Sequence, residues 1–487
     1  MAAHMTGEQP PEPAGGRAGP AGAAAGRGAH RPTQHLARWL LEPWFTPFAL
    51  VNGSAVGLTP ILLPLVAVRY GVGHVGLVMG AFNLGGFAAP LAGSLADRYR
   101  AYRGLAAAAA TVSAVALWLF PVAGPALQLL LALADGAGFA GAVTIANLLI
   151  VERRPRAEWN PRLGWLETVL SVGQGGALVL AAWLSELSGR EALLIGAVVP
   201  AAAVPLALLL IPRLPATAAP APGAEAGTVP PAAAAATPAP SAARARPLAA
   251  DPSERAQHRL SSVGHVGEWG PLSPSRAHHL HQRRRPLMGL SRILGGGFGW
   301  MLAAWIPAYA GSAVVFSLYP VLFQHAFGIA PRTSALAFAA IVFVSLPLFV
   351  LAGAVSQRRG PAMVMAGAFG ARILLLTALA VLAAIGHVPA VLPLAAFGGV
   401  LFAWSFLSVA SLGLTGQLVP NAEGDAQGML NASSGVAGLI GSVAGGLAAG
   451  HWGYPMALAI GAGATAAGLT VFAATVLRRA DRAEAPG

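Results

Sequence analysis

Twelve long apolar runs are the feature that most limits what this chain can fold into. A helix needs about 20 apolar residues to cross the hydrocarbon core of a bilayer, and each run is about that long. The runs cover residues 45–68, 74–96, 104–123, 126–151, 163–185 and 192–211, and then 298–325, 334–355, 362–385, 390–417, 428–450 and 455–477. Backbone groups in lipid must be hydrogen-bonded within their own segment. The runs also lack the alternation of a membrane β-barrel, so they are predicted to be helices.

Composition points to the same class and excludes several functions. Of the 487 residues, 56% are hydrophobic and 10% are charged, whereas a soluble domain carries roughly 25% charged residues. Because cysteine is absent, disulfides, zinc–thiolate sites and cysteine nucleophiles are excluded. All 30 basic residues are arginine, so neither a Walker A loop nor Schiff-base chemistry has its lysine. We therefore expect no cofactor and no enzymatic activity.

The arginines predict the orientation of the helices. If both termini are cytoplasmic, only Arg69, Arg190 and Arg332 fall on the outer side and Arg372 falls within a span. All other arginines then lie on the cytoplasmic side, as the positive-inside rule requires. The net charge of +12 is thus spread around a membrane rim that faces anionic lipid. This distribution argues against nucleic acid as a partner and predicts a multi-pass protein of a bacterial inner membrane.

Segments outside the apolar runs divide the chain. Residues 1–40 and 479–487 are interpreted as cytoplasmic tails, the first of them disordered. Residues 213–290 are rich in Pro and Ala and then polar, which is typical of a disordered cytoplasmic linker. A histidine tract at 278–281 lies in this linker, where a flexible chain does not fix metal-ligand geometry, so no metal site is expected. The expected bundles are residues 41–212 and 291–478.

The two sets of six runs contain an internal repeat. Three short stretches recur in the same order and at a nearly constant offset, which is more persuasive than any one match alone. Gly53–Val56 matches Gly311–Val314, Gly93–Arg98 matches Gly353–Arg358, and Gly164–Glu167 matches Gly428–Asn431. Two parallel six-helix halves joined by a linker are one layout that secondary transporters use. The expected fold is an all-α membrane protein with twelve transmembrane helices in two pseudo-symmetric bundles.

The loop after the second run carries the most specific motif. Gly93–Arg98 reads Gly-Ser-Leu-Ala-Asp-Arg. It resembles the start of the signature loop between helices 2 and 3 of the major facilitator superfamily, Gly-x-Leu-Ala-Asp-Arg-x-Gly-Arg-Lys/Arg. The later positions depart from that pattern, since Arg100 stands in place of the glycine. The second copy keeps Gly353 and Arg358 but has Gln357 in place of the acid.

The resemblance implies a gating role for this loop. In the family, the acidic residue and its neighbours hold the two halves together on the cytoplasmic side in the outward-facing state. The residues that match are Gly93, Asp97 and Arg98, with Gly353 and Arg358 in the second copy. We expect Gly93 to allow close helix approach and Asp97 to pair with an arginine near a helix N-terminus. A charged turn that only enforces topology is the alternative.

Charged groups inside spans are costly in lipid and are functional candidates by default. Asp135 stands about nine residues into the fourth run, which is roughly 13 Å at helical rise and close to the bilayer middle. The resemblance implies that this helix lines a central cavity, so Asp135 is a candidate proton or substrate site. Glu167 in the fifth run is a candidate gate residue or second protonation site, and the repeat places Asn431 at its counterpart. Structural pairing is the alternative for each.

Uncharged polar residues within the spans are further candidates for the substrate path. Asn52 and Gln174 are included in the candidate site with Asp135, although such residues more often serve helix packing. Drug–proton antiporters of the family carry an arginine in helix 4 within Arg-x-x-Gln-Gly-x-Gly, and here that arginine is missing and Asp135 takes the glutamine position. The branch of the family is therefore open.

Three functions remain after these observations. The first is proton-coupled export of small hydrophobic or amphipathic compounds by alternating access. The second is import of a small metabolite by proton symport, with sodium an alternative coupling ion in either case. The third is a non-transporting membrane sensor or enzyme. The expected partners are a small-molecule substrate, the coupling ion and lipid, and the protein is expected to act as a monomer.

Overall fold

The computed structural model describes residues 42–154, 156–213, 296–419 and 423–478. These residues are almost entirely helical, and no strand occurs among them. Among them are twelve helical spans, some of them made of consecutive helical pieces, that are long and apolar enough to cross a membrane. The predicted tails 1–40 and 479–487 lie outside the described residues, as does nearly all of the predicted linker 213–290.

The first half of the chain forms six spans, and four of them are built from more than one helical piece. Span 1 consists of η1 (Pro43–Phe45), α2 (Thr46–Gly53), the π-helical turn η2 (Ser54–Leu58), α3 (Thr59–Ala67) and η3 (Val68–Tyr70). Span 2 consists of α4 (Val72–Gly85), η4 (Gly86–Ala88) and α5 (Ala89–Tyr99). Spans 3 to 6 are α6 (Tyr102–Leu119) with η5 (Phe120–Val122), α7 (Pro125–Arg153), α8 (Arg156–Leu184), and α9 (Gly189–Gly196) with α10 (Val198–Leu210).

The second half forms six more regular spans. They are α14 (Gly297–Phe327), α15 (Pro331–Arg359), α16 (Pro361–Ile385), α17 (Val391–Leu418), α18 (Glu423–Trp452), and α19 (Tyr454–Phe472) with η6 (Ala473–Leu477). The twelve predicted spans and their helical structure are confirmed, and their limits differ from the prediction by a few residues. The differences are at the ends, where proline and glycine set the boundaries.

Local sequence explains where several spans begin and end. Pro331 and Pro361 each stand in the first turn of a helix, where the missing N–H has no intrahelical acceptor to lose. Gly328 ends α14 with φ +67°, in the left-handed region that an L side chain disfavours. Its N–H donates to the carbonyl of Gln324 at 3.1 Å and so closes the last turn.

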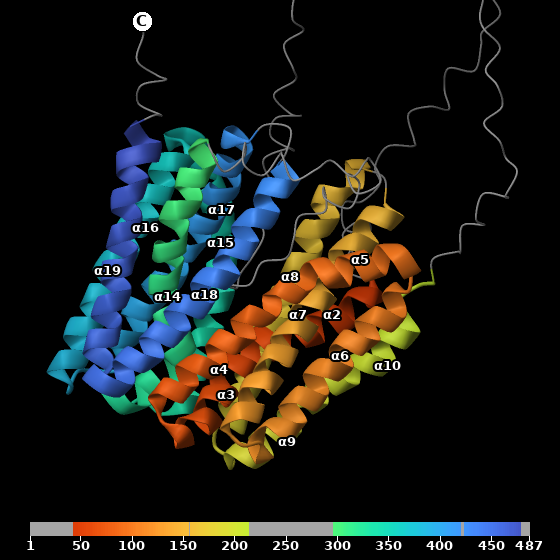
Figure 1. Ribbon diagram of the computed structural model, residues 1–487, viewed down its shortest axis with the longest axis horizontal. Coiled ribbons are helices and arrows are strands. Elements are labelled where there is room, and N and C mark those ends of the chain that lie inside the picture. The colour runs from red at the N-terminus through yellow and green to blue at the C-terminus, as the bar shows by residue number, and fades with distance from the viewer. Residues whose placement is uncertain (1–41, 155, 214–295, 420–422, 479–487) are drawn as a thin grey trace, which may run out of the picture. The chain divides into compact units, whose positions relative to one another are not determined.

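The helices of each half pack largely against one another, and a few pairs cross between the halves. The crossing pairs are α4 with α18, α8 with α15, and α14 with both α3 and α4. Figure 1 shows α4 and α18 side by side where the two colour groups meet. We call the end at which α5 and α15 finish the motif end, because Arg98 and Arg358 lie there. The other end is called the opposite end.

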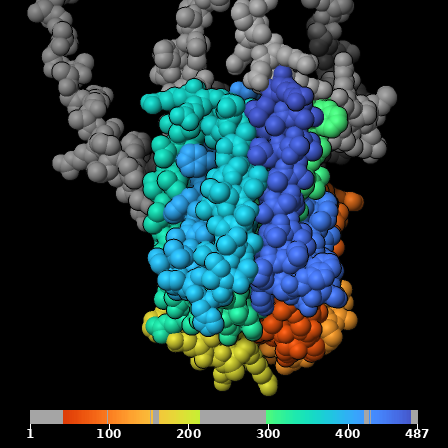
Figure 2. All heavy atoms as spheres, turned by 90° about the vertical axis from the view of Figure 1, so that its left-hand side faces the viewer, coloured from red at the N-terminus to blue at the C-terminus, as the bar shows by residue number. Residues whose placement is uncertain are grey.

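Large apolar side chains on the outward surfaces fit a lipid environment. Leu374 on α16 is 71% exposed and Leu209 on α10 is 73% exposed, which would be unfavourable in water and is expected in hydrocarbon. Figure 2 shows one such face, formed by the C-terminal helices standing side by side. Inside the same half, aromatic rings pack together, with Tyr319 stacked on Phe397 at a centroid distance of 4.1 Å.

Candidate functional site

Span 1 changes its hydrogen-bonding pattern in the middle of the predicted membrane segment. Residues Ser54–Leu58 form a π-helical turn in which the N–H of Thr59 donates to the carbonyl of Ser54, five residues earlier. Pro60 follows and has no N–H, so it cannot donate to the carbonyl of Val56 as an α-helix would require. π-helical turns are rare and are frequent at functional sites.

The residue that follows this turn contacts the buried acid of span 4. The hydroxyl of Thr59 donates to Oδ2 of Asp135 at 2.8 Å. Asp135 is 1% exposed and Thr59 is fully buried. The other carboxyl oxygen, Oδ1, is also buried and has no hydrogen-bond partner among the described residues. The Asp135 carboxyl group therefore lies buried within span 4 with a neutral hydroxyl group as its partner, and its role as a proton or substrate site stays a prediction.

The helices around Asp135 approach one another closely. A Cβ added at Gly136 would lie 2.0 Å from the carbonyl oxygen of Phe82, so α7 and α4 meet backbone to backbone there. On the side of α6, the buried hydroxyl of Ser113 donates to the backbone carbonyl of Asp135 at 3.4 Å. Since both contacts involve the main chain, they fix the part of α7 from which the Asp135 side chain projects.

Asn52 and Gln174 connect span 1 to span 5 rather than surrounding Asp135. The side-chain amide of Asn52 donates to the carbonyl of Leu170 at 2.9 Å. The amide of Gln174 donates to the carbonyl of Val56 at 3.3 Å, which is the group that Pro60 leaves without its α-helical donor. The structure therefore gives both candidates a helix-pairing contact, which is the alternative that such residues usually satisfy.

Glu167 and Asn431 lie on other helices than the Asp135 carboxyl group. Glu167 is half-buried on α8, where the hydroxyl of Ser171 donates to its backbone carbonyl at 2.8 Å. Asn431 is half-buried on α18. The hydrogen bonds of Asp135 come from Thr59 and Ser113, so neither Glu167 nor Asn431 is a hydrogen-bond partner of Asp135.

The two motif copies lie at equivalent helix ends. Arg98 and Arg358 are exposed in the last turns of α5 and α15. Asp97 lies in α5, but its side chain is outside the described part of the structure. The expectation that Gly93 permits close helix approach is not supported, because a Cβ there would meet Thr144 at an ordinary 3.5 Å. A Cβ at Gly353 would meet nothing within 4 Å.

Arg100, which stands where the signature has glycine, has a backbone conformation that favours glycine. Arg100 caps α5 in the left-handed region with φ +50°, and it is the one described non-glycine residue with positive φ. The equivalent position after α15 is Gly360, with φ +79°. The fold thus requires a left-handed residue at this point of both copies, although only the second copy supplies glycine. Arg100 also pairs with Glu152 at 3.7 Å.

Contacts between the halves include a close glycine seam on α4 and α18. A Cβ added at Gly76 would lie 2.3 Å from the carbonyl oxygen of Ser442 and 2.7 Å from the Cα of Gly446. Further along α4, the buried amide of Asn83 donates to the hydroxyl of Ser442 at 3.2 Å. This seam involves the half of span 2 that lies toward the opposite end, because α4 precedes α5 in that span.

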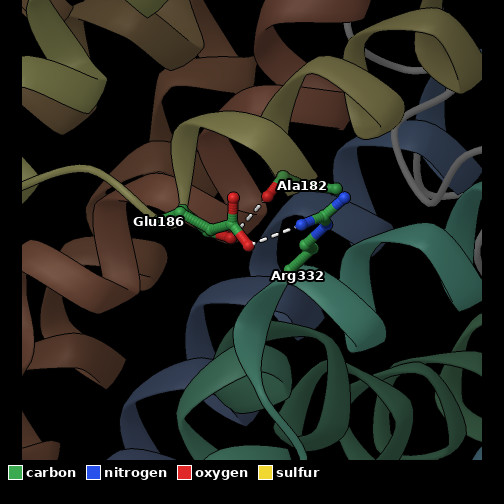
Figure 3. Close-up of polar contacts among 4 residues, drawn as sticks. Ala182, Glu186 and Arg332 are labelled. Carbon is green, nitrogen blue, oxygen red and sulfur yellow. Dashed lines mark hydrogen bonds and ion pairs between the residues drawn. The ribbon is translucent and has the colours of Figure 1, made fainter.

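An ion pair connects the halves at the opposite end. The guanidinium of Arg332, at the start of α15, donates to Oε1 of Glu186 at 2.7 Å, just beyond the end of α8 (Figure 3). The same guanidinium lies over the ring of Trp183, 4.4 Å from its centroid. Both charged side chains are partly exposed, at 39% and 49%, so the pair is accessible to solvent and salt.

The second half has a buried charge of the opposite sign. Arg372 on α16 is fully buried and donates to the hydroxyl of Ser312 on α14, the repeat counterpart of Ser54. Its guanidinium lies 5.3 Å from the ring centroid of Trp404 on α17. These contacts give the buried guanidinium a hydroxyl group and an aromatic ring as neighbours. Among the described residues, no group of three His, Asp or Glu side chains could hold a metal ion.

Comparison with known families decides the classification. A model of the Major Facilitator Superfamily matches residues 45–313, which is more than half of the chain. The chain belongs to the major facilitator superfamily. Because this is a family of transporters, the expectation that the chain is not an enzyme is confirmed. No curated protein sequence matches the chain.

Solved structures of the major facilitator superfamily share its fold. The crystal structure of the nucleoside transporter NupG superposes with a TM-score of 0.60 at 17% identity, covering 90% of this chain and 99% of that one. A D-xylose-proton symporter gives 0.60 at 14% identity, with 90% and 97% covered. A bacterial homologue of the human lysosomal transporter Spinster, inward-facing and unoccupied, gives 0.56 at 14% identity, with 91% and 95% covered. Such low identities establish the fold alone.

Sequence reasoning identified the superfamily and Asp135 but missed three residues that the structure places in contact. Thr59 gave a weak signal, because it directly precedes a proline inside an apolar run. Glu186 and Arg332 are charges just outside their runs, and nothing in their positions indicates that they are paired across the two halves.

Proposed function

We propose that this protein is a secondary active transporter that works by alternating access, with Asp135 as the group that binds and releases a proton. The observation that carries the proposal is the buried contact between Thr59 and Asp135, which joins spans 1 and 4. An ionised carboxylate in an apolar interior is costly unless it is paired. No Arg or His of the described residues forms an ion pair with Asp135.

The contacts between the halves support a rocking motion. The Glu186–Arg332 pair and the Gly76 seam connect the halves in the described state. On the proposed topology, with both termini cytoplasmic, these contacts close the outer side, and they would have to separate for the opposite state to form. Asp97 and Arg98, with Arg358, would then make the closing contacts at the motif end. Asp97→Asn is expected to insert normally and to lose most transport.

The proposed substrates are small hydrophobic or amphipathic compounds, moved outward across a bacterial inner membrane in exchange for protons. Aromatic side chains near the middle of the C-terminal half support an apolar substrate, because Trp305, Tyr309 and Trp404 lie within 6.1 Å of one another by ring centroid. Proton symport of a small metabolite is the second candidate. It is favoured by the fold shared with a D-xylose-proton symporter.

The test is a tolerance assay in an efflux-deficient bacterial host. Strains would express the wild type, Asp135→Asn or an empty vector, and a panel of toxic compounds would be titrated against each after membrane expression is verified. Thr465→Val serves as a control that removes another buried hydroxyl contact, within the C-terminal half and away from Asp135. Increased tolerance in the wild type and the control, lost in Asp135→Asn, is the expected result.

Two outcomes would overturn parts of the proposal. Equal growth of wild-type and vector strains across the panel would reject export and direct attention to uptake assays with nucleosides and sugars. Tolerance that Asp135→Asn retains in full would reject Asp135 as the coupling group while leaving export in place.

A further inference from the structure

Span 1 brings the hydroxyl of Thr59 to Oδ2 of Asp135. Two unusual backbone features lie directly before and after Thr59. The π-helical turn Ser54–Leu58 ends at Thr59, and Pro60 follows. Both Thr59 and Asp135 are almost fully excluded from solvent, at 0% and 1% exposure. Their 2.8 Å hydrogen bond is therefore protected from competition by water.

The π-helical turn changes the direction in which Thr59 points. A five-residue turn contains one residue more than an α-helical turn, and each residue rotates a helix by about 100°. Asn52 and Gly57, before or within the turn, contact α8. Thr59, directly after it, contacts α7 instead. The turn thus lets a single span face span 5 with one segment and span 4 with the next.

Span 5 supports this conformation from outside. Gln174 donates to the Val56 carbonyl inside the turn, and the Gly53 and Gly173 backbones are too close for a side chain, since a Cβ at Gly53 would lie 2.6 Å from the Gly173 carbonyl oxygen. Gln174 therefore supplies a donor to a carbonyl that Pro60 deprives of its α-helical partner in this irregular part of the span.

We propose that Thr59, held by the π-helical turn, is the positioning residue for Asp135. Its hydroxyl fixes Oδ2 as the acceptor, which leaves Oδ1 as the atom that receives the proton. This inference rests on the proposed role of Asp135 in proton binding. It adds a specific residue and a specific oxygen atom to that role, neither of which follows from the family motif.

None of the other described titratable groups on the neighbouring elements bonds to Asp135. His74 is in the first turn of α4 and pairs with Gln128 at 2.9 Å. Glu152 is on α7 itself, 17 residues beyond Asp135, or roughly 25 Å along the helix. The remaining groups on elements packed against α3, α6 and α7 are Arg69, Tyr70, Arg98, Tyr99, Tyr102, Arg103, Arg153, Arg162, Glu167, Arg190, Glu191, Tyr309, Tyr319 and His325, together with Asp97, Arg156 and Glu158, whose side chains lie outside the described set. Asp135 bonds none of those described.

The test uses infrared difference spectroscopy, which needs no substrate. The full-length protein in lipid bilayers would be compared at acidic and alkaline pH, and the C=O stretching band of a protonated carboxyl group would be assigned by its loss in Asp135→Asn. Thr59→Val keeps the shape of the side chain but removes the donor, so the band is expected to shift to higher frequency. Thr59→Ser keeps a hydroxyl and is expected to restore the wild-type frequency.

A matched control separates positioning from general packing. Thr465 is equally buried, on α19, and donates to the backbone carbonyl of Gly461 at 2.9 Å. Thr465→Val is expected to leave the carboxyl band unmoved. In the tolerance assay, Thr59→Val is expected to lower the protective effect about tenfold in compound concentration, as the loss of a hydrogen bond to a charged group would.

The outcomes distinguish this inference from the proposed function. If the wild type shows no pH-dependent carboxyl band that Asp135→Asn removes, the proton role itself fails. If the band exists and Thr59→Val leaves its frequency unchanged, Thr59 is not the positioning residue, although Asp135 still binds a proton. Should Thr59→Val fail to fold, Thr59→Ala gives the same reading, because it also lacks the hydroxyl.

Discussion

The guanidinium of Arg332 and the carboxylate of Glu186 meet at 2.7 Å across the two halves of the transporter, above the ring of Trp183. Exposed ion pairs of this kind contribute only about 0–1 kcal/mol. The pair is therefore strong enough to bias an equilibrium between two states and too weak to prevent the halves from separating.

Removing this ion pair is expected to shift the halves apart at the opposite end. Arg332→Gln should move the population by less than about fivefold, with a smaller effect in high salt, since salt screens exposed charges. Spin labels on cysteines introduced at Leu187 and Ala390, both exposed, would report the distance distribution. The natural chain has no cysteine, so no other thiol competes. A charge swap, Glu186→Arg with Arg332→Glu, should restore the wild-type distribution, and an unchanged distribution in the single variant would reject the gating role.

Gly76 is expected to tolerate no side chain while the α4–α18 seam is closed. Gly76→Ala would place a methyl group 2.3 Å from the Ser442 carbonyl oxygen, so the two helices must separate locally. Gly73→Ala on the same helix is the control, because its nearest neighbour would be at 3.6 Å. The same spin-label pair should show broadening toward longer distances for Gly76→Ala alone. Identical distributions for both variants would show that the seam is looser than the structure indicates.

The pairing of Gln174 with Val56 is expected to depend on Pro60. Gln174→Leu removes this side-chain donor from the buried Val56 carbonyl and should destabilise the protein by about 1–3 kcal/mol. Pro60→Ala restores an N–H at the α-helical donor position, so the cost of Gln174→Leu should be smaller in that background. Unfolding of the purified single and double variants, followed by tryptophan fluorescence, gives the coupling between the two sites. Strictly additive effects would contradict the explanation.

Arg100 and Gly360 both have positive φ. Exchanging the residue types at these two positions is therefore expected to have opposite effects on stability. Arg100→Gly relieves a conformation that costs an L residue about 1–2 kcal/mol, which offsets the loss of the exposed pair with Glu152, so stability should be unchanged or higher. Gly360→Arg places a side chain at φ +79° and ψ +145° and should cost about 1–3 kcal/mol. Thermal unfolding of both variants would test this, and equal losses of stability would refute it.

Much of the fold could be predicted from the sequence, because span length, apolar content and arginine placement depend on the bilayer rather than on tertiary detail. Asp135 could be placed near the membrane middle by counting helical residues. The partner of Asp135 could not, since Thr59 reaches it only after a π-helical turn has rotated span 1. Asn52 and Gln174 were assigned to the candidate site by polarity, and only the structure shows that backbone carbonyls of facing helices occupy their amides.

The signature loop shows a second property that the sequence pattern does not reveal. The pattern made Gly93 the candidate for close helix contact, yet the positive φ lies seven residues later, at Arg100. A sequence match reports which residues a family prefers, whereas backbone dihedral angles show why one of them is preferred. The second copy has glycine at this position and the first has arginine, yet both have positive φ. The positive φ therefore explains why glycine is preferred there.

The irregular turn in span 1 also makes this helix unusually sensitive to changes in length. Loss of one residue between Ser54 and Leu58 would restore regular α-helical spacing without removing any polar side chain. The segment beginning at Thr59 would then keep its composition and hydropathy, but its hydroxyl would face about 100° away from Asp135. Two homologous chains differing by that single gap would look interchangeable in a hydropathy profile and would differ in whether this acid has a partner.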